Sequence, residues 1–113
     1  MVLPVSGSPF ETGVAPISIA VDAVARLVYV ANSGENNISA YPVGSNGALI
    51  PVPNAPCSAG FAPVSIAVEP TGRFAYMANN MSNNVSAYRI GPSGNLIPVP
   101  GSPFAAESDL IQW

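Results

Sequence analysis

Five polar side chains in two corresponding loops are the strongest candidates for ligand binding in this chain. Amide and carboxylate groups at such positions could hold a sugar or a hydrated metal ion, because they offer hydrogen-bond donors and acceptors. The more ordinary role of Asn in a loop is to satisfy backbone groups or to adopt left-handed backbone angles. Glu35 stands apart because its counterpart in the second loop is Ser82, so the scaffold does not require an acid there. The candidate ligand-binding residues are Glu35, Asn36, Asn37, Asn83 and Asn84.

Catalytic chemistry is limited by the residue types that the chain lacks. It has no His and no Lys, and Cys57 is its single cysteine. A Cys–His nucleophile and a His- or Cys-based metal cluster are therefore excluded within one chain. Two acid–arginine pairs could contribute to a catalytic site. Both recur at the same position of the repeat, which instead favours a structural role in a turn, where the carboxylate accepts hydrogen bonds from nearby groups. We predict no catalytic residue, no metal and no cofactor. The pairs are Asp22 with Arg26 and Glu69 with Arg73.

Charge and hydropathy exclude two classes of partner. The net charge is −3 and three arginines supply all the positive charge, too few for the basic stripe that neutralises phosphates. No apolar run approaches the ~20 residues of a membrane helix. We therefore expect no nucleic-acid and no membrane partner. The first residues lack the basic and apolar regions of a signal peptide, and the sequence assigns no compartment.

The elements that position these residues repeat with a period of 47. The segment Ala15-Pro16-Ile17-Ser18-Ile19-Ala20-Val21 returns as Ala62-Pro63-Val64-Ser65-Ile66-Ala67-Val68, and Asn36-Asn37-Ile38-Ser39-Ala40-Tyr41 returns as Asn83-Asn84-Val85-Ser86-Ala87-Tyr88. A period of this length indicates stacked supersecondary units. The tyrosines recur on predicted strands at equivalent positions, so we expect them in the core.

Each unit is predicted to contain four short strands. Apolar, aromatic and β-branched runs alternate with turn residues such as Glu69-Pro70-Thr71-Gly72-Arg73. The fourth run ends in prolines, which lack an N–H donor, so we expect it at the outer edge of the sheet. The strands are expected at 18–22, 27–32, 37–43 and 49–52, and again at 65–69, 74–79, 84–90 and 96–99.

The motifs themselves resemble a known family. The second copy reads Pro-Val-Ser-Ile-Ala-Val-Glu-Pro-Thr-Gly-Arg-Phe-Ala-Tyr-Met-Ala-Asn from Pro63, then Ser-Asn-Asn-Val-Ser-Ala-Tyr, then Leu-Ile-Pro-Val-Pro-Gly-Ser-Pro-Phe to Phe104. This pattern is similar to the YVTN-type, lactonase-like β-propeller repeats. The first copy departs from it at Ala23-Val24-Ala25 and at Asn54-Ala55-Pro56-Cys57. The resemblance implies an all-β fold of four-stranded antiparallel blades. Some members hydrolyse sugar lactones, but this sequence has no motif onto which a catalytic residue can be carried.

The register of the repeats divides the chain into two blades with extra segments. We predict an isolated outer strand at 1–13, blade 1 at 14–60, blade 2 at 61–107 and an off-pattern tail at 108–113. A blade cannot bury both of its faces alone. We therefore expect six or eight blades in a ring made by a homotrimer or homotetramer, the alternative being a piece of a longer chain.

Three functions remain open from the sequence. The first is a non-enzymatic module that self-assembles into a ring and presents loops to a small molecule, a sugar or a partner. The second is a lactonase-like hydrolase whose site is assembled across subunits. The third is an engineered or truncated propeller fragment without its own activity. A ligand would meet the loops at 10–16, 33–37, 57–63 and 80–84.

Overall fold

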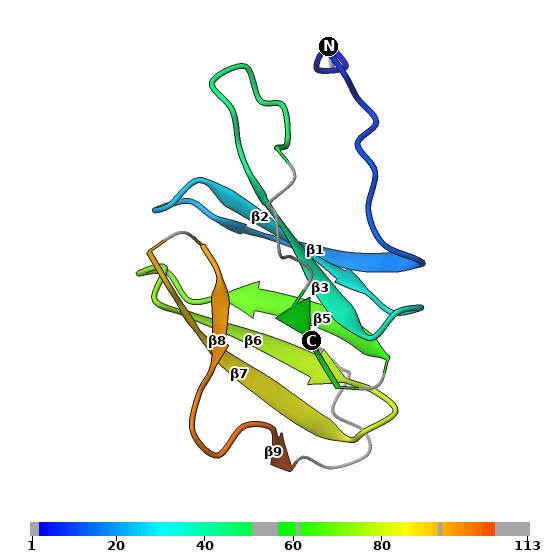
Figure 1. The fold of residues 1–113 in the computed structure, drawn as a ribbon, viewed down its shortest axis with the longest axis vertical. Coiled ribbons are helices and arrows are strands. Elements are labelled where there is room, and N and C mark those ends of the chain that lie inside the picture. The colour runs from blue at the N-terminus through cyan, green and yellow to red at the C-terminus, as the bar shows by residue number, and fades with distance from the viewer. Residues whose placement is uncertain (1–2, 51–56, 61, 93, 106–113) are drawn as a thin grey trace.

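The described part of the protein consists of short antiparallel strands joined by turns (Figure 1). The computed structural model describes residues 3–50, 57–60, 62–92 and 94–105. Every strand pairing among them is antiparallel. The predicted all-β class is therefore confirmed. The strands are β1 (Pro16–Asp22), β2 (Leu27–Asn32), β3 (Asn37–Pro42), β4 (Cys57–Ser58), β5 (Pro63–Val68), β6 (Phe74–Asn79), β7 (Asn84–Ile90), β8 (Leu96–Pro98) and β9 (Phe104–Ala105).

These strands form two sheets of the same topology, one for each copy of the repeat. The first sheet has the order β1-β2-β3-β4, and the second has the order β5-β6-β7-β8 with β9 also on β7. Three strands, β2, β6 and β7, have the bounds that the sequence predicts. The first strand of each sheet begins two residues earlier than predicted, at Pro16 and Pro63, because the missing N–H of a proline is tolerated at a strand start.

The outer strand predicted at 96–99 is confirmed as β8, at the edge of the second sheet, and a further short strand, β9, follows it that the sequence did not predict. The two are joined by a turn in which Ser102 N donates to Val99 O at 2.9 Å. The prolines cannot donate to a ladder, so the turn supplies the missing bonds. Val99 N donates to Ala87 O at 2.9 Å, and Ala87 N donates to Ser102 Oγ at 2.9 Å. In the first blade, Leu49 bridges Val43 and β4 completes the edge. Residues 51–52 of the predicted strand and the predicted tail at 108–113 lie outside the described residues.

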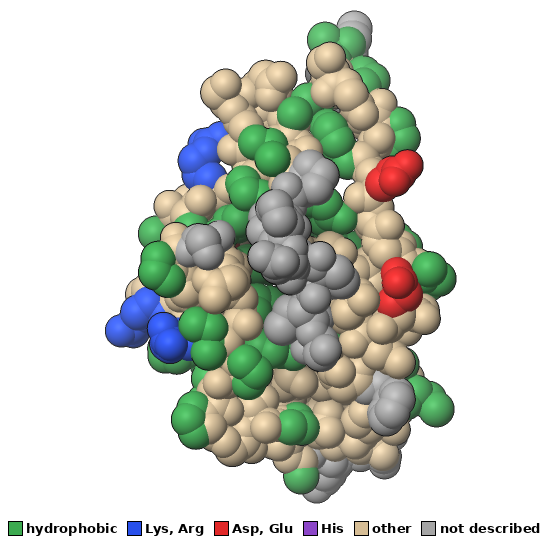
Figure 2. Space-filling view, viewed as in Figure 1, with side chains coloured by type: hydrophobic (Ala, Val, Ile, Leu, Met, Phe, Trp, Pro, Cys, Tyr) green, Lys and Arg blue, Asp and Glu red, His purple; other side chains and the backbone are tan. Residues whose placement is uncertain are grey.

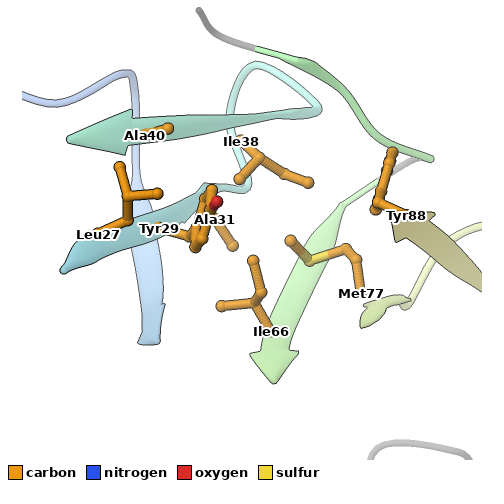
Figure 3. Packing of buried hydrophobic residues seen from close by; sticks show 8 residues of the cluster. All are labelled: Leu27, Tyr29, Ala31, Ile38, Ala40, Ile66, Met77 and Tyr88. Carbon is orange, nitrogen blue, oxygen red and sulfur yellow. The ribbon is translucent and has the colours of Figure 1, made fainter. Parts of the chain in front are cut away.

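The two blades pack face to face around a shared apolar core (Figure 3). We call the side of blade 1 that faces blade 2 its back face and the opposing side of blade 2 its front face. The back face contributes three residues of β2 and two of β3, and the front face contributes Ile66, Met77 and Tyr88. The removal of this apolar surface from water is the main force that holds the two sheets together. The back-face residues are Leu27, Tyr29, Ala31, Ile38 and Ala40.

The front face of blade 1 carries the same kinds of side chain but has no described blade against it. Val28, Val30 and Tyr41 form a smaller cluster on this face, and Ile19 beside them is 62% exposed. Its repeat counterpart Ile66 is 7% exposed, because blade 1 covers it. The front face of blade 1 is thus open along β1, although Val28, Val30 and Tyr41 beside it are already buried.

The expectation that the tyrosines lie in the core is wrong for one of them. Tyr29, Tyr41 and Tyr88 are buried, but Tyr76 is 40% exposed. Tyr76 is the counterpart of Tyr29 and lies on the back face of blade 2, which no other described blade covers. The repeat places the residue correctly, and the absence of a neighbouring blade among the described residues leaves it exposed.

Candidate functional site

The candidate ligand-binding residues lie in the turns between β2 and β3 and between β6 and β7, where each turn closes on a buried Asn. Asn32 Nδ2 donates to Asn37 Oδ1 at 2.9 Å and to Ser39 Oγ at 2.7 Å. In the second blade, Asn79 Nδ2 donates to Asn84 Oδ1 at 2.9 Å and to Ser86 Oγ at 2.8 Å. Asn37 and Asn84 therefore act first as acceptors that fix their own turns.

Asn36 ties the turn of blade 1 to the linker between the blades. Its backbone has φ +58°, a left-handed conformation that Asn tolerates well. Its side-chain Oδ1 accepts from Ala62 N at 2.9 Å, and its backbone carbonyl accepts from Ala59 N at 2.9 Å. Asn83 has the same left-handed backbone, with φ +53°, and is exposed. Both positions thus have a conformational reason to be Asn.

Glu35 is exposed, but one of its oxygens is engaged. Its Oε1 accepts from Val14 N at 2.6 Å, which connects residues 21 apart in the sequence. The carboxylate also lies against Gly13, next to the buried side chain of Asn32. Asn32 Oδ1 has no hydrogen-bond partner within the described residues, whereas its counterpart Asn79 Oδ1 accepts from Gly60 N at 3.1 Å. Glu35 therefore anchors the segment that enters β1, and among the described residues its second oxygen makes no hydrogen bond.

Four of the five candidates are thus engaged in bonds of the scaffold, and the turns bring them together at one end of each blade. Their assignment to ligand binding stays a prediction. The engagement of Glu35 with Val14 could not be seen from the sequence, because it depends on how the linker folds back over the turn.

The two acid–arginine pairs lie at the opposite ends of the same strands and behave as turn residues. Asp22 is buried, and its Oδ1 accepts from Val24 N at 3.1 Å and from Ala25 N at 3.3 Å. Asp22 Oδ2 has no hydrogen-bond partner in the described structure. These bonds agree with the interpretation of Asp22 as a turn-capping carboxylate.

In the second pair Arg73 is exposed and Glu69 is partly exposed, and the carboxylate of Glu69 accepts more hydrogen bonds than that of Asp22. Glu69 accepts from the Thr71 hydroxyl, from Thr71 N at 3.2 Å and from Arg73 N at 2.7 Å. The Thr71 hydroxyl bond, followed by the Arg73 backbone bond, lowers the pKa of Glu69 from 4.5 to about 2. Arg73 lies over the Phe74 ring, 5.7 Å from its centroid, and so covers the hairpin.

A buried tyrosine connects the two blades at this same end. Burial, and then the charge of Asp22, raise the pKa of Tyr29 from 10.0 to about 12. Its hydroxyl donates to Gly94 O at 2.8 Å. Tyr29 is therefore a neutral hydrogen-bond donor in the interface, and it has no access to a substrate.

Other kinds of site find little support in the described ranges. They contain no group of three or more acidic, His or Cys side chains that could hold a metal ion. They also contain no helix long and apolar enough to cross a membrane. Figure 2 shows arginine side chains on one side of the view and acidic side chains on the other, with no broad basic surface.

The described structure has a shallow apolar hollow that the sequence did not single out. It lies on the open front face of blade 1 and is lined by Thr12, four residues of β1 and Val30. Its walls include Ile17 and Ile19, both exposed. The alternating isoleucines Ile17 and Ile19 are visible in the sequence, but the sequence does not say whether another blade covers them.

Comparison with known families gives one extended match. The family model described as lactonase, 7-bladed β-propeller matches residues 2–108. No curated protein sequence matches the chain.

Solved structures share the arrangement of strands. The periplasmic gluconolactonase PpgL of Pseudomonas aeruginosa superposes with a TM-score of 0.74 and 24% identity, over 95% of this chain and 29% of that one. A candidate 6-phosphogluconolactonase of Bacteroides fragilis gives 0.72 and 17%, over 80% of this chain and 25% of that one. A functionally unknown protein of Desulfotomaculum acetoxidans gives 0.72 and 20%, over 82% and 29%. The chain thus spans between a quarter and a third of the length of these structures.

Proposed function

The chain belongs to the lactonase family of seven-bladed β-propellers, and we propose that it serves as a two-blade scaffold that copies of itself complete to a ring. The ring presents the loops of each blade to a ligand or partner, and the scaffold itself is not catalytic. The observation that carries this proposal is the chemical match between the open front face of blade 1 and the packed front face of blade 2.

The match extends over the whole contact surface. Val28, Val30 and Tyr41 of the open face are the counterparts of Ala75, Met77 and Tyr88, and all six are buried; the exposed part of the open face is β1. At the other end of the molecule, the back face of blade 2 repeats the back face of blade 1. A second copy can therefore place its blade 2 against this blade 1 by repeating the contact that the two blades already make. Burying this face removes exposed isoleucine and valine side chains from water, at about 25 cal/mol per Å².

The contact is head to tail, so it must close to avoid an open filament. Each chain contributes two blades, and a closed ring then holds six blades in a trimer or eight in a tetramer. Both numbers lie in the range that propellers adopt. A trimer or tetramer leaves no blade face uncovered. The alternative is that a longer chain supplies the other blades. The mass of the protein in solution distinguishes a ring of copies from this alternative.

Ligand binding is assigned to the turns that carry Glu35 and Asn83. The second carboxylate oxygen of Glu35 has no hydrogen-bond partner among the described residues, and Asn83 is exposed on the equivalent turn of blade 2. A neutral polyol or sugar suits such a mixture of acceptors and amide groups. The chain has no His and no Lys, and the carboxylates of Asp22 and Glu69 are engaged in turns. Few side chains therefore remain that could act as a general base.

The rival function is lactone hydrolysis at a site shared between subunits, and family membership favours it as the second candidate. The test is hydrolysis of gluconolactone by the purified, assembled protein. Hydrolysis that disappears in Glu35→Gln and persists in Glu11→Gln would establish the enzyme and contradict the scaffold. Absence of hydrolysis, together with closed six- or eight-bladed rings in electron micrographs, is the result that we expect.

A further inference from the structure

The turn that follows β3 holds the one Asn-Gly step of the sequence, Asn46-Gly47. We propose that this turn modifies itself: the backbone nitrogen of Gly47 attacks the side-chain amide of Asn46, ammonia leaves, and the resulting succinimide opens to aspartate and isoaspartate. The reaction needs only water and takes place within one chain. It is therefore independent of the proposed ring and gives the protein a site of spontaneous covalent change.

The reacting residues are open to water. Ser45, Asn46 and Gly47 are all exposed, and their turn projects beyond the end of β3 (Figure 1). Gly47 N donates to Gly44 O at 2.9 Å, so this nitrogen is engaged while the turn is closed. Hydrogen bonds of exposed turns open locally at a small cost in free energy. Each opening frees the nitrogen at a surface where water for the later hydrolysis is present.

The side chain of Asn46 is folded back along the peptide unit that would attack it. Asn46 Oδ1 accepts from Ala48 N at 3.1 Å, which closes a side-chain turn around Gly47. Asn46 Cγ and Gly47 N are both members of the ring that this bond closes, so the two reacting atoms are held near each other. The Ala48 N–H also polarises the amide carbonyl, and it can stabilise the negative charge that develops on Oδ1 during the attack.

The glycine serves both the turn and the reaction. Gly47 has φ +87°, a left-handed conformation that glycine adopts without strain. Because Gly47 has no Cβ, its backbone nitrogen is open to the side chain that precedes it. The corresponding step of blade 2 is Ser93-Gly94, and serine has no amide to lose. The glycine therefore belongs to the repeat, whereas the reactive amide is found in blade 1 alone.

The other described asparagines lack this combination. None of them is followed by glycine. A side chain on the following residue shields the backbone nitrogen, and the strand positions and buried positions restrict it further. Asn80 provides the matched comparison, because it is exposed in a turn but is followed by Met81. We therefore expect product at Asn46 and little at Asn80.

The chemistry balances with water as the only co-reactant. Gly47 N gives its proton to water and forms a bond to Asn46 Cγ, while the bond between Cγ and Nδ2 breaks. The Nδ2 group takes up a proton and leaves as ammonia. Water then adds to one of the two carbonyls of the succinimide. Opening at Cγ gives aspartate, and opening at the backbone carbonyl of residue 46 gives isoaspartate.

Both products alter the turn. Each adds one negative charge to a chain whose net charge is −3. Isoaspartate also lengthens the main chain by a methylene at a point where Val5 lies against Gly47. The corresponding turn of blade 2 carries Gly94, whose carbonyl accepts the Tyr29 hydroxyl across the blades. The change therefore falls on the kind of turn that joins one blade to the next.

Ageing of the purified full chain in mildly alkaline buffer tests this inference. We expect an acidic species to accumulate on ion exchange, with a mass gain of about 1 Da that peptide mapping assigns to Asn46 in two isomeric forms. Asn46→Ser, which carries the residue of blade 2, is the control and should lose this species. Product at Asn80 should be roughly tenfold lower than at Asn46.

Three results would overturn the inference: an Asn46 that stays intact over several weeks, an acidic species that forms equally in Asn46→Ser, or equal product at Asn80. Met81→Gly tests the geometry, since it gives Asn80 a following glycine without the bond from Ala48 N. Reaction there as fast as at Asn46 would overturn the role of the folded-back side chain. A monomer that gives the expected products would contradict the ring and leave this inference standing.

Discussion

The hydroxyl of Tyr29 in blade 1 donates a hydrogen bond of 2.8 Å to the carbonyl of Gly94 in blade 2, 65 residues away in the sequence. Gly94 is close-packed against Leu27, where a Cβ atom would lie 2.5 Å from Leu27 Cδ1. One repeat away, Tyr76 and Gly47 are the same two residue types on the two open faces. If the protein forms a ring, the Tyr29–Gly94 contact is the pattern for a contact between copies.

Removing the Tyr29 hydroxyl should destabilise the fold. Tyr29→Phe leaves the buried Gly94 carbonyl without its donor, which costs about 1–2 kcal/mol in the free energy of unfolding. Urea denaturation of wild type and variant measures this difference. Tyr76→Phe is the matched control, because its hydroxyl is on the open face: it should leave unfolding of the isolated chain unchanged and weaken association. Equal losses of unfolding free energy in both variants would contradict this difference between the faces.

The same tyrosine should make stability fall in alkali. Its pKa is raised to about 12 in the folded state, against 10.0 for the unfolded chain. The unfolded state therefore loses its proton first, so stability is fully present below pH 10 and is lost as pH rises toward 12. We expect the stability advantage of wild type over Tyr29→Phe to shrink across this window. An advantage that stays constant from pH 9 to pH 12 would show that the hydroxyl is not buried.

Glu69 should have the opposite effect in acid. Its pKa is lowered to about 2 by the Thr71 hydroxyl and by the Arg73 backbone N–H. The carboxylate therefore contributes stability above pH 4.5, and this contribution disappears as pH falls toward 2. The difference in urea midpoint between wild type and Glu69→Gln should narrow over that range. Thr71→Val removes the hydroxyl donor, so in that background Glu69→Gln should lower the urea midpoint by less above pH 4.5. A midpoint difference between wild type and Glu69→Gln that does not change with pH would contradict the lowered pKa of Glu69.

Equivalent isoleucines should respond in different ways to substitution. Ile66→Ala empties a packed position between the blades and should cost about 2–5 kcal/mol in the free energy of unfolding. Ile19→Asp, at the same place on the open face, should leave the fold of the single chain stable and abolish association. Thermal unfolding and light scattering on both variants distinguish the two effects. Assembly that survives Ile19→Asp would show that copies do not meet through this face.

The sequence predicts most of the strands because each blade repeats its own pattern of apolar residues and turns. Three strands, β2, β6 and β7, have the predicted bounds, since aromatic and β-branched residues in them are flanked by turn residues in both copies. The outer strand predicted at 96–99 is confirmed as β8, but its continuation in β9 is not predicted. Its prolines indicate an edge, but the hydroxyl of Ser102 that satisfies Ala87 N is a tertiary contact without a local signal.

The site is less predictable than the strands for a related reason. The positions of Asn36 and Asn83 indicate turns, and the left-handed backbone at both agrees with that. The bond from Val14 N to Glu35 depends on the path of a linker 21 residues away, which periodicity does not encode. Likewise, a 47-residue repeat predicts what each face contains, but not which copy of the face is covered.

The most direct test of the ring is the mass of the full chain in solution, measured by light scattering at micromolar concentration. A closed ring predicts three or four times the 11.5 kDa of a single chain. A mass of 11.5 kDa that persists as the concentration rises would contradict it, because the open faces would then remain uncovered in the functional protein.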